Sequence, residues 1–72
     1  MKIIGGEARD VVWSESRDNG GMFDSEVGVY RDGDHYRAYV TDSWGAGIRS
    51  RQHESESVAR GDIERLWDRL YG

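Results

Sequence analysis

Cysteine and proline are both absent from the sequence, and no part of it is long and uninterruptedly apolar. Without cysteine, the chain can form neither a disulfide bond nor a thiolate metal site. No run approaches the roughly 20 apolar residues that a membrane-spanning helix needs. The opening MKIIGGEARD has one lysine and only two isoleucines as bulky apolar residues, so we expect no signal peptide. These features predict a cytoplasmic protein with no membrane partner.

Positive charge is also scarce, and lysine occurs only once. The chain has 10 basic and 14 acidic residues, which gives a formal net charge of −4. Charges of both signs are interspersed, so the broad basic surface typical of nucleic-acid-binding proteins is not predicted. Nine of the ten basic residues are arginine, which suits planar pairing with carboxylates. The acidic excess favours solubility and would attract a basic partner.

The length of 72 residues predicts a single α+β domain over 1–72. Eight aromatic residues favour a packed fold over disorder. A core of this size supplies only a few kcal/mol of net stability, so a partner or self-association would help to stabilise it.

The first half of the chain alternates short apolar runs with turn signals. Residues 7–16 are a strand candidate centred on Val11, Val12 and Trp13, and KII at 2–4 fits a short strand or a packed arm. The RDNGG sequence at 17–21 predicts a turn. Residues 22–30 then alternate as a strand, with Phe23, Val27 and Val29 on one face.

The stretch VYRDGDHYRAYV, residues 29–40, predicts a hairpin with Asp32 and Gly33 as a two-residue type I′ turn. That turn would pair Tyr30 with His35 and Val27 with Ala38. Because side chains alternate along a strand, the two faces follow from the spacing. One face would carry Val27, Val29, Tyr36, Ala38 and Val40. The other would carry Tyr30, His35, Arg37 and Tyr39.

The second half predicts a loop at 41–47, a further strand at 48–54, a polar connection at 54–57 and a helix near the end. In DIERLWDRLYG, apolar residues recur at helical spacing as a stripe of Ile63, Leu66, Trp67, Leu70 and Tyr71. The sequence therefore predicts a three- or four-stranded antiparallel meander sheet with one C-terminal helix packed on one face. The other face of the sheet would be open to water, and whether Trp44 lies in the core or at an interface is left open.

The water-facing side of the hairpin is the candidate binding surface. Tyrosine and arginine are enriched in the residues that dominate protein interfaces, and nearby carboxylates could engage a basic partner. The predicted partner-binding residues are Tyr30, His35, Arg37, Tyr39, Asp32, Asp34 and Glu26. An ordinary solvated sheet face would carry the same residue types. Two other functions stay open: a small nucleic-acid-binding regulator that uses this face, and a homodimeric structural protein with paired sheet edges.

Catalytic and metal-binding patterns are not recognisable. His35 and His53 have no metal-ligand spacing, and no nucleophile, base and orienting acid can be assembled. We therefore expect no enzyme activity, no metal and no cofactor.

About half of the chain resembles the type I-F anti-CRISPR proteins, a phage family that binds the crRNA-guided surveillance complex. The family's hairpin pattern V-Y-x-x-G-x-x-x-x-A-x-V is matched by Val29, Tyr30, Gly33, Ala38 and Val40. The segment DIERLWDRLYG is similar to the family's acidic, tryptophan-containing helix, and the opening MKxI is shared.

The resemblance implies a small phage-type inhibitor, in the host cytoplasm, that binds proteins stoichiometrically and blocks target DNA binding by CRISPR type I effector subunits. Of the family's functional residues only one tyrosine carries over, as Tyr30, where it would face the backbone subunit of the complex. A functional glutamate is replaced by Thr41 and a second tyrosine by Gly6.

Overall fold

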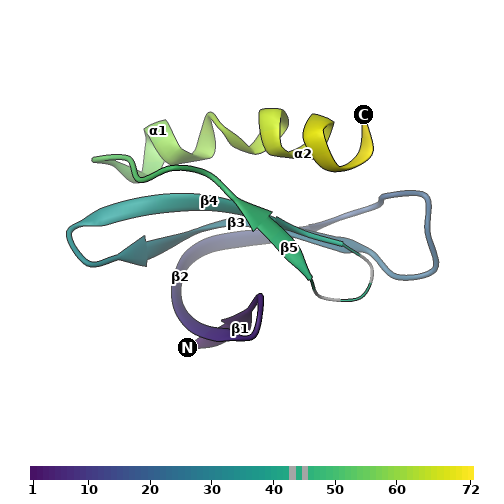
Figure 1. Cartoon of the computed structure of the whole chain (residues 1–72), viewed down its shortest axis with the longest axis horizontal. Helices are drawn as coiled ribbons and strands as arrows, with labels where there is room; N and C mark the ends of the chain where they lie inside the picture. The colour runs from purple at the N-terminus through teal and green to yellow at the C-terminus, as the bar shows by residue number, and fades with distance from the viewer. Residues whose placement is uncertain (43, 45) are drawn as a thin grey trace.

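The computed structural model describes residues 1–42, 44 and 46–72 as a two-layer α+β fold (Figure 1). A five-stranded antiparallel sheet has the order β1-β2-β3-β4-β5, so each strand pairs with its neighbour in the chain. Two helical segments at the C-terminus lie on one face of β3 and β4. The strands and helices are β1 Lys2–Ile4, β2 Glu7–Arg17, β3 Ser25–Asp32, β4 His35–Thr41, β5 Gly47–Arg49, α1 Glu56–Arg60 and α2 Ile63–Tyr71.

The predicted fold class is confirmed: an antiparallel meander carries a C-terminal helix on one face. The sheet has five strands because the KII segment pairs with the start of β2. The predicted strand over 48–54 is shorter, since β5 ends at Arg49 and only an isolated bridge joins Tyr36 to His53. The predicted loop over 41–47 includes residues 43 and 45, which lie outside the described residues.

The main core lies between the sheet and α2. Val27, Ala38 and Val40 from the sheet are fully buried against Ile63 and Leu66 from the helix. Trp13, Ile48, Trp67 and Leu70 pack around this cluster, so the predicted helical stripe does face the sheet. Burial of these apolar side chains is the main stabilising contribution to the fold.

The predicted faces of the β3–β4 hairpin are confirmed, but its predicted register is wrong. Val27 pairs with Val40 and Tyr30 with Arg37, two residues further along β4 than expected. The turn residues are Gly33 and Asp34 instead of Asp32 and Gly33. Gly33 has a φ of +64°, which glycine adopts at little cost, while Asp34 does not have positive φ. Glycine at the first turn position is the arrangement of a type II′ turn.

The segment at 54–57, expected as a polar connection, instead begins a helix. Ser55 is the N-cap of α1, and its side chain accepts a hydrogen bond of 3.2 Å from the backbone N–H of Val58. Ala59 is the buried residue of this short helix. The other apolar residue of α1, Val58, is 56% exposed. The helix therefore has no stripe of apolar residues from which the sequence could have predicted it.

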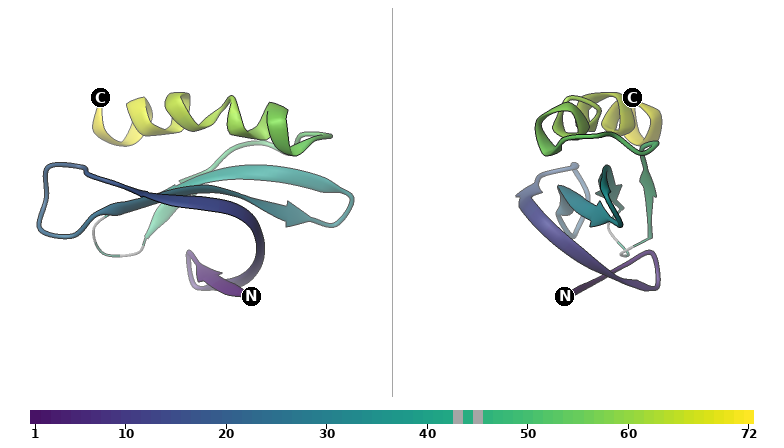
Figure 2. Two further views of the ribbon diagram at one scale, coloured as in Figure 1. Left: turned by 180° about the vertical axis from the view of Figure 1, so that it is seen from behind. Right: turned by 90° about the vertical axis from the view of Figure 1, so that its left-hand side faces the viewer.

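A β-bulge bends β2 and curls the sheet. Val11 pairs with Tyr30 while Trp13 pairs with Val29, so Val12 is the extra residue. The bulge places Val11 and Trp13 on opposite faces, although residues two apart share a face in a regular strand. On the N-terminal side of the bulge lie the start of β2 and the short strand β1, which together we call the curl. The curl turns under the side of β3 and β4 that the helices do not cover (Figures 1 and 2).

Candidate functional surfaces

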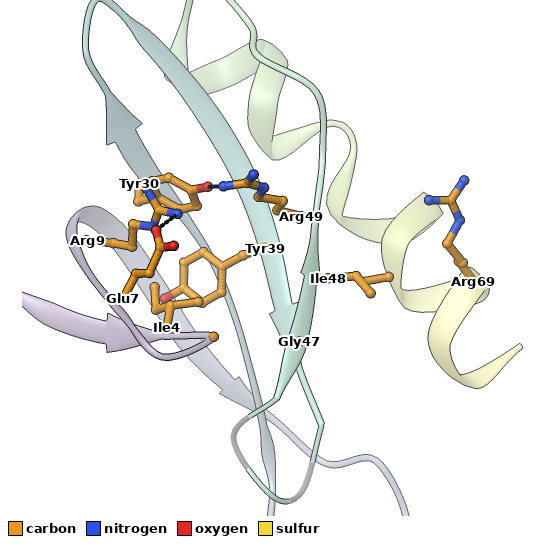
Figure 3. A pocket seen from close by; sticks show the side chains of 10 residues that line it. Ile4, Glu7, Arg9, Tyr30, Tyr39, Gly47, Ile48, Arg49 and Arg69 are labelled. Atoms are coloured by element: carbon orange, nitrogen blue, oxygen red, sulfur yellow. Dashed lines mark hydrogen bonds and ion pairs between the residues drawn. The ribbon is translucent and has the colours of Figure 1, made fainter.

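The face predicted to be open to water is covered, and this part of the prediction is wrong. Tyr30 is 1% exposed and Tyr39 is 0% exposed. The curl of β1 and β2 lies over them, and Figure 3 shows both rings beside Ile4, Glu7 and Arg9 from that curl. The bulge at Val12 is the physical reason, because it turns an edge of the sheet back over its own face.

Tyr30 is held by contacts on three sides. Its ring centroid lies 6.1 Å from that of Tyr39, and the guanidinium carbon of Arg9 lies 5.0 Å from the Tyr30 centroid. Arg49 donates a hydrogen bond of 3.3 Å from Nη1 to the Tyr30 hydroxyl. This hydrogen bond raises the pKa of Arg49, so the guanidinium stays charged. Tyr30 is therefore a packed residue of a second, smaller core.

Tyr39 donates its hydroxyl hydrogen to the carboxylate of Glu26. Glu26 also accepts an ion pair from Lys2, with 2.5 Å between Nζ and Oε1, which ties β1 to β3. Burial, together with the hydrogen bond to Glu26 and its negative charge, raises the pKa of Tyr39 well above its ordinary value. The predicted partner-binding residue Glu26 is thus engaged within the protein, by Tyr39 and Lys2.

This raised pKa predicts a loss of stability in alkali. The unfolded chain releases the Tyr39 proton near pH 10, whereas the folded chain keeps it. The contribution of Tyr39 to the free energy of unfolding is therefore complete below about pH 10. Above that pH it falls by about 1.4 kcal/mol per pH unit. We expect Tyr39→Phe to flatten this alkaline slope in urea unfolding between about pH 9 and pH 11. Equal slopes in the two proteins would contradict the assignment.

The other predicted binding residues gather near the β3–β4 turn. Arg37 donates from Nε to Asp32 at 2.7 Å and from Nη1 to the Ser50 carbonyl at 2.9 Å. Hydrogen bonds from Arg37 and Gln52 lower the pKa of Asp32. His35 is half-buried and Asp34 is exposed. The seven residues therefore form two separate groups, one beneath the curl and one at the turn.

An exposed apolar cluster that the sequence reasoning missed lies in the loops at one end of the sheet. Met22 is 87% exposed, Phe23 53% and Trp44 84%. The rings of Phe23 and Trp44 meet edge to face, with 6.1 Å between their centroids and 68° between their planes. We call Met22, Phe23 and Trp44 the aromatic tip. Phe23 was predicted to lie in a strand, but β3 begins only at Ser25.

The loop that carries Phe23 is fastened to the domain. The side-chain amide of Asn19 donates to Ser25 Oγ at 2.7 Å, to the Phe23 carbonyl at 3.1 Å and to the Tyr71 hydroxyl at 3.2 Å. The hydroxyls of Ser25 and Tyr71 are themselves 2.5 Å apart. The exposed side chains therefore project from a loop that is anchored to both the sheet and α2.

A signal for this cluster is present in the sequence. Met22 and Phe23 directly follow two turn glycines, and Trp44 stands in a glycine-rich stretch. A bulky residue in a turn has no sheet face to pack against, so it is left at the surface unless another element covers it. The alternation predicted over 22–30 therefore forms a strand only from Ser25 onwards.

The curl also borders a cavity of about 440 Å³, drawn in Figure 3. Tyr30, Tyr39, Arg9, Arg49 and Arg69 are among its lining residues. Glu7 is next to Arg9 and pairs with it. Among the described residues, no group of three or more His, Asp or Glu side chains is arranged to hold a metal ion, and no helix is long and apolar enough to cross a membrane.

Comparison of the chain with protein-family models, with curated proteins and with solved structures finds no match.

Proposed function

We propose that this protein is a small inhibitor or adaptor that acts by stoichiometric protein binding, with the aromatic tip as its contact surface. The observation that carries the proposal is the exposure of Met22, Phe23 and Trp44. Met22 and Phe23 stand on a loop that Asn19 ties to the sheet and to α2. Exposed apolar clusters of this kind mark interaction sites, and aromatic side chains contribute much of the free energy of protein association. A partner would cover surface that is unfavourable to leave in water.

The negative charge around the aromatic tip indicates which kind of partner surface it would fit. Asp18, Asp24 and Asp42 flank the tip residues in sequence, and the loops at 18–24 and 42–46 contain no lysine or arginine. Asp18 and Asp42 accept hydrogen bonds of 2.8 Å from backbone N–H groups two residues on, which fixes their carboxylates at the starts of the loops. The complementary partner is a protein with an apolar pocket bordered by basic residues. Charge complementarity of this kind accelerates association and orients the partners.

The resemblance to type I-F anti-CRISPR proteins supplies one particular version of this proposal. In that version the partner is a type I surveillance complex, whose nucleic-acid-binding grooves are basic, and the protein blocks binding of the target DNA. Tyr30 carries the resemblance but is only 1% exposed. The aromatic tip, rather than Tyr30, would then make the contact.

The proposal is tested with a tagged protein captured from cells that carry CRISPR type I effectors, followed by mass spectrometry. We expect Phe23→Ala/Trp44→Ala to lose the captured partner, because it removes most of the exposed aromatic surface. Each hot-spot truncation of this kind weakens binding by about 2 kcal/mol or more, which is more than about tenfold in affinity. Folding of each variant is checked by circular dichroism.

Val58→Ala is the matched control, because Val58 is also an exposed apolar residue, at 56%, but lies on α1. It should retain the partner at the wild-type ratio. Recovery of type I effector subunits with the wild type and Val58→Ala alone would support the anti-CRISPR version. A captured set that is unchanged by the tip substitutions would overturn the proposed surface. A doubled mass in light scattering, lost on tip substitution, would instead assign the tip to a homodimer.

A further inference from the structure

The charged residues of α2 are sorted by side. At 100° per residue, Arg65 and Arg69 fall on one flank of the helix, while Glu64 and Asp68 fall on the other. Glu64 pairs with Arg17 of β2, with 2.8 Å between its Oε1 and Nη2. The flank of α2 that carries Arg65 and Arg69 faces β5.

The segment opposite that flank is also basic. Arg49 ends β5, and Arg51 follows two residues later. Together with Arg65 and Arg69 they line a groove of about 150 Å³ between β5 and α2, which we call the arginine groove. One acidic residue is among the described residues that line it. This is Asp62, which contacts His53 at 2.5 Å and Arg65 at 3.7 Å.

Three of these four arginines, Arg49, Arg51 and Arg69, form no ion pair with a carboxylate in the described part of the chain, although acidic residues outnumber basic ones. The fourth, Arg65, lies 3.7 Å from Asp62. Like charges at i and i+4 of a helix, as in Arg65 and Arg69, are destabilising. A protein with a net charge of −4 gains nothing in solubility from such a cluster. A bound anion would relieve this repulsion.

We propose that the arginine groove binds the phosphodiester backbone of single-stranded nucleic acid. Guanidinium groups pair with phosphate oxygens in a bidentate geometry. The groove shares the lining residues Arg49 and Arg69 with the cavity beside Tyr30, which Arg9 also lines, so arginines border both hollows. In Figure 3 the Arg49 guanidinium is turned towards the Tyr30 hydroxyl, while Arg69 lies on α2 on the other side of β5. A linear polyanion can extend over both hollows and contact the arginines of each.

An acidic peptide fits the arginine groove less well. Among the described residues that line the groove, Leu66 is the one apolar side chain, and it is only 4% exposed. A peptide would therefore have little apolar surface to cover, whereas a phosphodiester backbone needs cations alone. Tyr30 and Tyr39 are buried and offer no face on which bases could stack. Binding should accordingly be insensitive to base sequence and strongly dependent on salt.

The test is fluorescence anisotropy with a labelled oligothymidylate at several salt concentrations. Four neutralised phosphates predict a slope of about −2.8 in a plot of log affinity against log salt, or about 50-fold between about 50 mM and about 200 mM. Arg65→Gln/Arg69→Gln should halve that slope to about −1.4. Arg31→Gln is the control for a single charge. It removes an exposed arginine near the β3–β4 turn and should leave the slope unchanged, whereas Arg69→Gln alone should reduce it.

Three results would overturn the proposal. One is no anisotropy change with wild-type protein at low salt. Another is a slope that falls as much with Arg31→Gln as with Arg69→Gln, which would indicate a general charge effect. The third is tighter binding of a labelled polyglutamate than of the oligonucleotide, which would assign the arginine groove to acidic protein segments. Variants of the aromatic tip should bind the oligonucleotide like the wild type, which separates this site from the proposed protein-binding surface.

Discussion

Substitution of Gly28 by alanine is expected to lower the free energy of unfolding by about 3 kcal/mol. A Cβ at this position would lie 2.5 Å from the Trp13 carbonyl oxygen and 2.7 Å from the Tyr39 hydroxyl oxygen. Gly28 pairs with Tyr39 on β4, and β2 runs along its other side, so the added methyl group has no open direction. Relief would require the central strands to separate, because one of the two contacts is with backbone.

Urea unfolding followed by tryptophan fluorescence measures this loss. Gly61→Ala is the matched control, because Gly61 has a φ of −63° and a ψ of −20°, which alanine adopts readily. Alanine in a helical conformation is favoured over glycine by roughly 1 kcal/mol. A Cβ at Gly61 would lie 3.2 Å from the Val58 carbonyl oxygen, a much milder contact than those at Gly28, so this control should stay within about 1 kcal/mol of the wild type. If Gly28→Ala unfolds at the same urea concentration as the wild type, the close approach of Tyr39 to β3 is wrong.

The second large effect is expected from Tyr30→Ala, which should destabilise the fold by about 3–5 kcal/mol. The truncation leaves a cavity beneath the curl and removes the ring that contacts Tyr39 and Arg9. It also leaves Arg49 without the hydroxyl to which it donates. The sequence analysis instead places Tyr30 on a water-facing binding surface, where the same truncation would cost binding and leave folding unchanged.

Tyr30→Phe separates packing from hydrogen bonding. The ring stays in place and only the contact to Arg49 is lost, so the destabilisation should be about 1 kcal/mol. Thermal unfolding of the three proteins by circular dichroism compares them directly. A Tyr30→Ala protein within about 1 kcal/mol of the wild type would mean that the curl does not cover this face in solution.

The sequence predicted the faces of the central hairpin correctly and its register incorrectly, and the same physical rule explains both results. Side chains alternate with a period of two, so a shift of two residues leaves every side chain on the same face. Val27 and Val40 therefore lie in the core in either register. The turn decides between the registers, and the choice depends on whether Gly33 occupies its first or second position.

The curl and the aromatic tip could not be predicted by the same reasoning. A β-bulge depends on how two strands pair, and nothing in the pattern of Val11, Val12 and Trp13 distinguishes a bulged strand from a regular one. The predicted binding residues Tyr30 and Tyr39 were assigned to the correct face, but that face is buried by a distant segment. Exposure of a sheet face depends on the tertiary structure, which strand alternation does not contain.

The most direct test of protein binding through the aromatic tip is site-specific photo-crosslinking. Phe23 is replaced by p-benzoylphenylalanine in one protein, and Asp34, in the exposed β3–β4 turn, is replaced in another. Both are irradiated in cells from which the wild type captures its partner. We expect a discrete covalent adduct with that partner from position 23 and none from position 34. An adduct from position 34 alone, or from neither position while the partner is still captured, would contradict the assignment of the aromatic tip as the binding surface.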